Sequence, residues 1–419
     1  MFKRCIFLVA GIAVAFAMPA HSLSLEEAVT LAVERAPELQ VDEARIAEQS
    51  VAISIEKDGW LPALKGTSEI GTSNNVRNEL RLSQTVYDWG KTRAKVNREE
   101  SSKQQLVYSA KTNREILVLE IVELYLDWLG ANARMTASDD EVSRLKNLVA
   151  LTRRRVGTVV DRVELTRAET ALARARERRV IAQGDFLEAL GSLEQRIGRR
   201  LIERDIKRFP NWHRWFSAIP HHQLQDWVKA APAIKSAKAS VNTAEAKLEV
   251  SKTERIPSLS LEFVAERVED SFGHRTDNRV ALRVETPLFQ GLSSWRRPRS
   301  AEMAVSAAKF EQEQLEQRML RELRSSLTLI RVLGDRVPAI QAQLEASEVT
   351  LDLYLKQFLV GRREIADLIG AENERMDALI SKIEVEVEQA RLGAAIASEL
   401  GQLEDRLLDR LPVAKPEGA

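Results

Sequence analysis

Residues 161–198, DRVELTRAETALARARERRVIAQGDFLEALGSLEQRIG, decide the fold. Apolar or small side chains recur along this stretch at alternating steps of three and four residues, if Arg179 is counted as the one charged member. This spacing is typical of a coiled-coil seam and predicts a long helix with a packed partner. The seam consists of Leu165, Ala168, Leu172, Ala175, Ala182, Phe186, Ala189 and Leu193.

The partner helix is predicted directly before this stretch, over residues 91–155, where the same spacing recurs and no proline occurs. A helix of that length is about 97 Å long at about 1.5 Å per residue, whereas the hydrocarbon core of a bilayer is about 30 Å thick. The helix is also rich in Arg and Glu. We therefore expect it to stand in water and to form a hairpin with residues 161–198, with the turn at Val156, Gly157 and Thr158.

The order of features in the first half of the chain returns in the second half. Matching positions are separated by an offset that grows from 195 to 203 residues, as two copies of one unit with small insertions would give. The matches include Ala36-Pro37 with Ala231-Pro232, Leu61-Pro62 with Ile256-Pro257, Gly90 with Gly291, and Gly198 with Gly401.

The duplication divides the chain into repeats. The divisions are a signal peptide at 1–22, a first repeat at 23–198, an inter-repeat belt segment at 199–222, a second repeat at 223–403 and a tail at 404–419. Strands are expected at about 60–71 and 79–90 in the first repeat and at about 256–266 and 279–290 in the second, whose helical hairpin covers 293–401. Ser24 is expected to cap the first helix, and Pro338 to interrupt and kink the outgoing arm of the second hairpin.

The first 22 residues resemble a secretory leader. Lys3 and Arg4 precede an apolar run over residues 5–17, and Ala20 and Ser22 offer small side chains before a cut. A retained anchor is the alternative. Cys5 is the only cysteine of the chain and lies in this segment, so the exported protein is expected to have no disulfide and no cysteine-based metal site. Basic and acidic residues are interleaved and balance to zero net charge, which argues against a nucleic-acid partner.

Three of the four expected strands, the second of the first repeat and both of the second, alternate apolar and polar side chains, as in Leu80, Arg81, Leu82 and Ser83. Strands of this length and pattern are the unit of a membrane β-barrel. Trp60, Tyr87 and Trp89 lie at strand ends, where the aromatic girdles of barrels occur. A small soluble sheet packed on helices is the alternative. Four strands cannot close a barrel, so the membrane interpretation requires an oligomer with 8, 12 or 16 strands.

The duplicated order of helix, two strands, long helix, turn and helix resembles the TolC-like outer-membrane efflux proteins. So do the motifs LSLEEAVTLAVERAPELQ, SQTVYDWGKTRA, VGTVVDRVELTRAE and VGRREIADLIGAE, which together span residues 23 to about 403. The resemblance implies a mainly helical fold with a small membrane β part: a homotrimer with a 12-stranded β-barrel in outer-membrane lipid and an α-barrel tunnel in the periplasm. It also implies docking onto a periplasmic adaptor protein that is linked to an ATP-driven or proton-driven inner-membrane transporter.

The same resemblance assigns candidate site residues at the two hairpin turns. Val156, Gly157 and Thr158 in the first repeat and Val360, Gly361 and Arg362 in the second would face the adaptor; the simpler alternative is that the glycines only make turns. Family members carry acidic residues at a periplasmic gate, six and nine positions after the second tip glycine. The first position is Asp367 here and the second is Gly370, so one acidic ring is absent. A solvated Asp367 on a helix face is the alternative.

No catalytic constellation, phosphate-binding loop or cofactor motif occurs in the sequence. His213, His221 and His222 could bind a metal, but ordinary surface histidines explain them better. We therefore expect a channel without enzymatic activity, cofactor or metal, which acts as the exit duct of an efflux or type I secretion system. The rival hypothesis is a soluble periplasmic coiled-coil scaffold or adaptor. The substrate, a small compound or an unfolded polypeptide, cannot be distinguished from the sequence.

Overall fold

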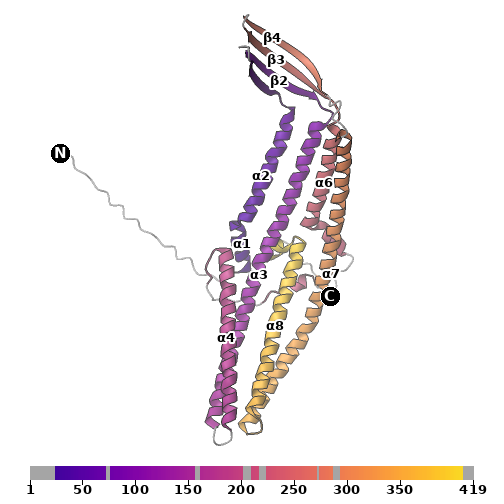
Figure 1. Cartoon of the computed structure of the whole chain (residues 1–419). Helices are drawn as coiled ribbons and strands as arrows, with labels where there is room; N and C mark the ends of the chain where they lie inside the picture. The colour runs from indigo at the N-terminus through magenta and orange to yellow at the C-terminus, as the bar shows by residue number, and fades with distance from the viewer. Residues whose placement is uncertain are drawn as a thin grey trace, which may run out of the picture.

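A four-stranded sheet and the ends of two helical hairpins occupy opposite ends of a long molecule (Figure 1). The computed structural model describes residues 24–71, 76–155, 161–201, 209–216, 223–270, 273–285 and 293–408. The first repeat contains α1 (Leu25–Arg35), α2 (Pro37–Lys57), η1 (Asp58–Trp60), β1 (Ala63–Ile70), β2 (Val76–Tyr87), α3 (Lys91–Arg155) and α4 (Arg162–Ile197). After η2 (Trp212–Trp215) come α5 (Leu224–Ala230), α6 (Pro232–Thr253), β3 (Ser258–Asp270), β4 (Gly273–Glu285), α7 (Ser293–Leu359), α8 (Ile365–Glu399) and α9 (Leu403–Leu407).

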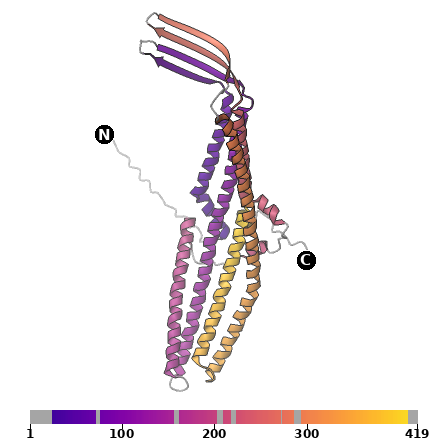
Figure 2. The same ribbon diagram turned by 45° about the vertical axis from the view of Figure 1, so that its right-hand side comes forward.

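The predicted hairpin of the first repeat is confirmed. α3 is a single helix of 65 residues, and α4 returns along it for 36 residues. The seam positions Ala168, Leu172, Ala175, Phe186 and Leu193 are buried, as the three-and-four spacing requires. In the lower half of the molecule α4, α3, α8 and α7 form a row in which α4 and α7 are the outer members (Figures 1 and 2).

The expected interruption of the second hairpin at Pro338 is wrong. α7 runs unbroken for 67 residues through both Pro298 and Pro338. It bows in its lower half (Figure 2). A proline removes only one backbone donor from a helix this long, and buried neighbours such as Leu333 and Ile340 hold the segment in place.

The sheet order is β1-β2-β3-β4, with every neighbouring pair antiparallel. The expected strand bounds need correction. β1 begins at Ala63 rather than at residue 60, because residues 58–60 form a short 3-10 turn. β2 begins three residues earlier than expected, β3 continues to Asp270, and β4 begins six residues earlier, at Gly273. The polar stretches there pair in register across the sheet. The expected strand residues 286–290 lie outside the described residues.

The core lies midway along the molecule, where α1, α9 and η2 gather against α3, α4 and α8, and α5 packs against α7. α1 begins with a capping box, because the Ser24 hydroxyl accepts from the Glu27 N–H at 3.2 Å and the Glu27 carboxylate accepts from the Ser24 N–H at 3.3 Å. The Ser24 cap is therefore confirmed. Trp212 and Phe216 of the belt segment are buried in this core, while residues 202–208 and 217–222 lie outside the described part.

A glycine with positive φ follows the return helix in each repeat. Gly198 follows α4 and Gly401 lies just beyond α8. A side chain at Gly401 would place its Cβ 2.3 Å from the Pro232 ring at the start of α6, and one at Gly198 would come within 2.6 Å of Arg35. In both repeats, therefore, the end of the return helix lies against the helices with which that repeat begins.

Candidate functional site

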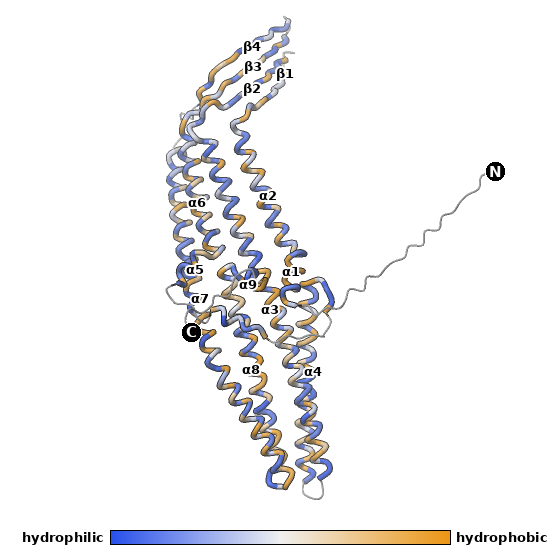
Figure 3. Tube along the Cα trace, turned by 180° about the vertical axis from the view of Figure 1, so that it is seen from behind, coloured by the Kyte–Doolittle hydropathy of each residue, from blue (hydrophilic) through white to orange (hydrophobic). Residues whose placement is uncertain are grey.

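One face of the sheet is apolar and exposed. The register pairs Leu82 with Phe263 and Leu261 with Leu282, so these side chains share a face. Along β3 the apolar part of this face runs from Leu259 to Ala265, about 20 Å along the strand. Figure 3 shows orange and blue segments alternating along the strands. The exposed members are Leu64, Leu80, Leu82, Leu261, Phe263, Val280, Leu282 and Val284.

Further from the helices the same face becomes polar, with Arg267, Glu269 and His274 on it. The apolar face is therefore a band, bordered by polar residues at the far end of the sheet.

The opposite face of the sheet is charged. Glu262, whose side chain is only 8% exposed, pairs with Arg81 at 3.2 Å and with Arg283 at 2.9 Å. Arg81 also binds Glu79 at 2.6 Å. The face carries six basic and six acidic side chains: Lys65, Glu69, Arg77, Glu79, Arg81, Glu262, Glu266, Arg275, Asp277, Arg279, Arg283 and Glu285.

The predicted aromatic residues gather at the end of the sheet nearest the helices. Tyr87 ends β2, lies opposite Leu259 on the apolar face, and packs edge-to-face on Trp89 with ring centroids 4.8 Å apart. Trp60 is half exposed in the turn before β1. The sequence analysis missed Trp295, which is 71% exposed in the first turn of α7 and stacks on Arg255 at 4.6 Å. An isolated tryptophan in a helix gave no pattern that could have identified it.

The second hairpin ends in a defined turn. Gly361 has φ 77°, and the N–H groups of Gly361 and Arg362 donate to the carbonyl oxygens of Phe358 and Gln357, both at 3.0 Å. This is the Schellman arrangement, which satisfies the last carbonyls of α7. Val360 is 68% exposed at the tip. Residues around the turn line a hollow of about 830 Å³, which another molecule could enter.

The first hairpin holds the second at this end. Arg155, the last residue of α3, donates to the carbonyl oxygens of Phe358, at 2.6 Å, and of Leu359, and its guanidinium lies over the Phe358 ring at 5.6 Å. The structure thus brings the end of α3 onto the predicted second tip. The predicted tip residues Val156, Gly157 and Thr158 lie outside the described residues.

Asp367 lies in the first turn of α8, close to the second tip. Its carboxylate is about a third exposed and pairs with Arg363 at 3.3 Å, while Arg363 also lies over the Tyr354 ring at 4.4 Å. The charge of this candidate gate residue is therefore partly offset within the same chain. At Gly370 a Cβ atom would meet nothing within 4 Å, so the absence of a second acidic residue has no steric cause.

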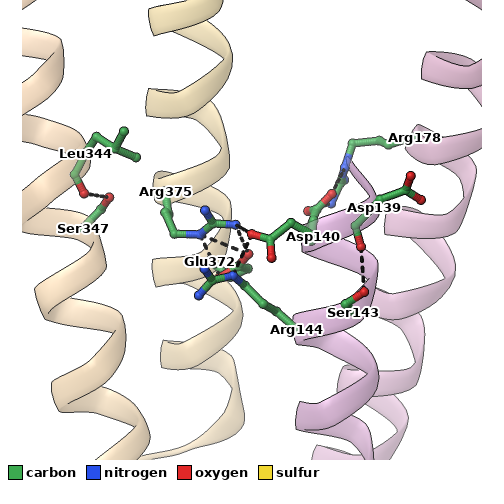
Figure 4. Close-up of polar contacts among 10 residues, drawn as sticks. Asp139, Asp140, Ser143, Arg144, Arg178, Leu344, Ser347, Glu372 and Arg375 are labelled. Atoms are coloured by element: carbon green, nitrogen blue, oxygen red, sulfur yellow. Dashed lines mark hydrogen bonds and ion pairs between the residues drawn. The ribbon is translucent and has the colours of Figure 1, made fainter. Parts of the chain in front are cut away.

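A polar cluster joins the two hairpins above the tips (Figure 4). Arg375 of α8 has a side chain only 3% exposed; it binds Glu372 at 2.8 Å and Asp140 of α3 at 3.2 Å. Asp140 also accepts from Arg144 at 2.9 Å. Because a charge buried without a partner costs several kcal/mol, this arrangement fixes α8 against α3.

Two neighbours of Asp140 point to the other side, toward α4. Glu141 is fully buried and binds Arg178, and this hydrogen bond raises the pKa of the Arg178 guanidinium. Asp139 binds Arg179, the charged member of the seam. The sequence analysis missed this cluster, although three consecutive acidic residues on α3 facing an arginine-rich α4 were a visible signal.

Within the described residues no group of three His, Cys, Asp or Glu side chains could hold a metal ion. The side chain of His213 and the whole of His221 and His222 fall outside that part of the chain. None of the described helices is sufficiently long and apolar to pass through a membrane.

Comparisons with known proteins identify the family. The model of the outer membrane efflux protein family matches residues 28–199 and 224–402, that is, both repeats. The outer membrane efflux protein BepC of Brucella suis is 20% identical, over all of this chain and 95% of its own length. The protein CyaE of Bordetella pertussis is 25% identical over 68% of this chain and 64% of its own length.

The fold matches that of solved outer-membrane channels. The outer membrane protein VceC of Vibrio cholerae superposes with a TM-score of 0.76 at 15% identity, over 90% of this chain and 96% of that one. The chain therefore belongs to the outer membrane efflux protein family and is a channel protein of the outer membrane with a periplasmic helical extension, not an enzyme.

Proposed function

We propose that three copies of this chain form the exit duct of an efflux or type I secretion system. In this proposal twelve strands close a β-barrel, with the apolar face of each sheet toward lipid and the charged face toward a water-filled lumen. The observation that carries the proposal is the sheet itself, which has an apolar band on one face and charged side chains on the other.

The free edges of the sheet support the trimer. β1 and β4 are the end strands, so their outer backbone groups have no partner strand in the described chain. Each unpaired group would cost several kcal/mol in lipid. Pairing β4 of one copy with β1 of the next removes both edges. The polar far end of the apolar face, with Arg267 and Glu269, would then lie outside the membrane, and Trp60, Tyr87, Trp89 and Trp295 would lie at the periplasmic interface.

The helical ends would dock onto a periplasmic adaptor that is linked to an inner-membrane transporter. Exposed Val360, Gly361 and Arg362, with the hollow beside them, supply a contact surface at the second tip. Arg155 at the end of α3 binds the Phe358 carbonyl oxygen and so holds the end of the first hairpin level with the second tip. Passage through the duct is passive, and the transporter supplies the energy. A small compound and an unfolded polypeptide would need the same kind of duct.

Reconstitution tests the proposal. Protein purified from the outer membrane in mild detergent should be trimeric and should give discrete single-channel currents in planar bilayers. Recovery of a monomer from the soluble periplasm, without detergent, would instead support the rival hypothesis of a coiled-coil scaffold. The exposed apolar face disfavours that rival, because soluble proteins rarely leave so many contiguous apolar side chains in water.

A further inference from the structure

The outer helices α4 and α7 each carry a second heptad stripe that nothing in the described chain covers. On α4 it comprises Thr166, Ala173, Val180 and Leu187, on the side away from the seam with α3. On α7 it comprises Val332, Ala339, Ala346 and Leu353. Val180 is 66% exposed, Leu187 57%, and Val332 and Leu353 50% each. We call these stripes the outer seams.

We propose that the outer seam of α4 in one copy packs antiparallel against the outer seam of α7 in the next copy. The inference rests on the proposed trimeric duct and specifies which side chains meet in it. A stripe repeating every seven residues is the form of surface that a second helix covers in a coiled coil.

The register of this contact follows from counting along the sequence. Thr166, Ala173, Val180 and Leu187 lie 9, 16, 23 and 30 residues after Gly157 of the first tip. Leu353, Ala346, Ala339 and Val332 lie 8, 15, 22 and 29 residues before Gly361 of the second tip. The described hairpin ends reach the same level (Figures 1 and 2). With all tips level, Thr166 therefore meets Leu353, Ala173 meets Ala346, Val180 meets Ala339, and Leu187 meets Val332.

Charge also favours the first hairpin of one copy beside the second hairpin of another. The 51 residues centred on Gly157 contain 12 basic and 7 acidic side chains, whereas the 51 centred on Gly361 contain 6 basic and 10 acidic. Two first hairpins side by side would therefore repel each other, and a first hairpin beside a second would attract it.

Exposed side chains beside the outer seams carry these charges. On α4 they are Arg162, Arg167, Arg174 and Arg176, for which the described structure contains no ion pair. On α7 they are Glu345 and Asp352. In the register above, Arg176 and Glu345 differ in level by two residues, about 3 Å along the helices, and lie on the same side of the interface. This pair is therefore expected to form an ion pair between copies.

Disulfide cross-linking tests the register. Cys5 is the only cysteine of the chain, so engineered cysteines have no native competitor outside the predicted leader. A variant with Ala173→Cys and Ala346→Cys should give covalent dimers and trimers on oxidation in intact cells. In the matched control, Ala173→Cys with Ala339→Cys, the cysteines are displaced by seven residues, about 10.5 Å. That displacement exceeds the span of about 7 Å that a disulfide can bridge, so the control should stay monomeric on the non-reducing gel.

The outcomes separate this inference from the proposed function. If the wild type is a trimer but the Ala173–Ala346 pair stays unlinked, or the control links instead, the register is wrong and the duct proposal survives. Cross-linked species that contain another protein would overturn the inference in the same way. If the wild type is not a trimer, both proposals fail.

A charge reversal provides a second measurement. Arg176→Glu should lower the trimer fraction several-fold at low salt, and adding Glu345→Arg should restore it. Since high salt screens such a pair, the loss should shrink as salt is raised. Failure of the second substitution to rescue the first would remove this ion pair from the interface.

Discussion

Asp367, the proposed gate residue, has its charge partly offset by an arginine of its own chain. In a trimer three such carboxylates would face one axis and attract cations. Arg363, 3.3 Å away in each copy, offsets part of that charge. The negative charge of the expected Asp367 ring is therefore smaller than a count of acidic residues indicates. Because residue 370 is a glycine, no second acidic ring accompanies it.

Substitutions at these two positions should move ion selectivity in opposite directions. Asp367→Ala removes the carboxylate and leaves Arg363, so cation preference should fall. Gly370→Asp adds a carboxylate where a Cβ atom meets nothing within 4 Å, so it should fold normally and raise cation preference. Reversal potentials in planar bilayers under a salt gradient measure both effects. Unchanged potentials in both variants would remove this turn of α8 from the conducting path.

Glu115 predicts a pH dependence of stability. Burial raises the pKa of this carboxyl to about 7, and the neighbouring Glu404 and Asp405 act in the same direction, although the Leu403 N–H donates to it at 3.0 Å. Arg114 is engaged with Glu404. The unfolded chain loses the Glu115 proton near its ordinary pKa of 4.5, whereas the folded chain keeps it to about 7. The free energy of unfolding should therefore fall as pH rises through this window, by at most about 1.4 kcal/mol per pH unit.

The check compares melting temperatures at pH 5 and pH 8 for detergent-solubilised protein. Glu115→Gln retains an acceptor for Leu403 and removes the titration, so its melting temperature should change less between the two pH values. Glu120→Gln, at an exposed position on the same helix, should behave as the wild type does. Equal pH dependence in all three proteins would show that Glu115 is not coupled to folding.

At the scale of elements, α3 and α8 are joined by two ion pairs that differ in burial. Arg375 and its α8 neighbour Glu372 are buried, and Arg375 also binds the half-exposed Asp140 of α3, whereas Arg391 binds Asp127 at 2.7 Å with both side chains about a third or more exposed. Arg375→Leu leaves carboxylates without their partner and should cost about 3–5 kcal/mol. Arg391→Leu should cost less than about 1 kcal/mol. Urea unfolding monitored by circular dichroism measures both; equal losses would mean that burial does not determine the strength of this contact.

The elements also differ in how far the sequence could predict them. The seam of α4 was predictable residue by residue, because Ala168, Leu172 and Ala175 repeat at a spacing that only a helix satisfies. The start of β4 was not, because His274, Arg275 and Thr276 are polar and their strand state depends on pairing with β3. The cluster around Arg375 combines residues of α3 and α8, which are distant in sequence, so local patterns could not identify its partners.

For the whole molecule, the two faces of the sheet should differ in tolerance to charge. Leu282→Arg places a cation on the apolar face and should destabilise the inserted barrel by about 2–4 kcal/mol. Ala281→Arg, one residue earlier, points to the charged face opposite Glu262 and should be tolerated. The amount of each variant in the outer-membrane fraction measures the difference. Equal yields would mean that this face does not contact lipid.

The order of strands in the sheet has a consequence for biogenesis. β1 with β2 and β3 with β4 can each pair as local hairpins, but β2 must find β3 across the 170 residues between Tyr87 and Ser258. Closing so large a loop is slow compared with local pairing. Until it closes, two strand edges remain open to pairing with the wrong chain. We expect the pairing of β2 with β3, which joins the two hairpins into one sheet, to limit the rate of folding. A periplasmic holding chaperone should be needed most before this pairing is complete.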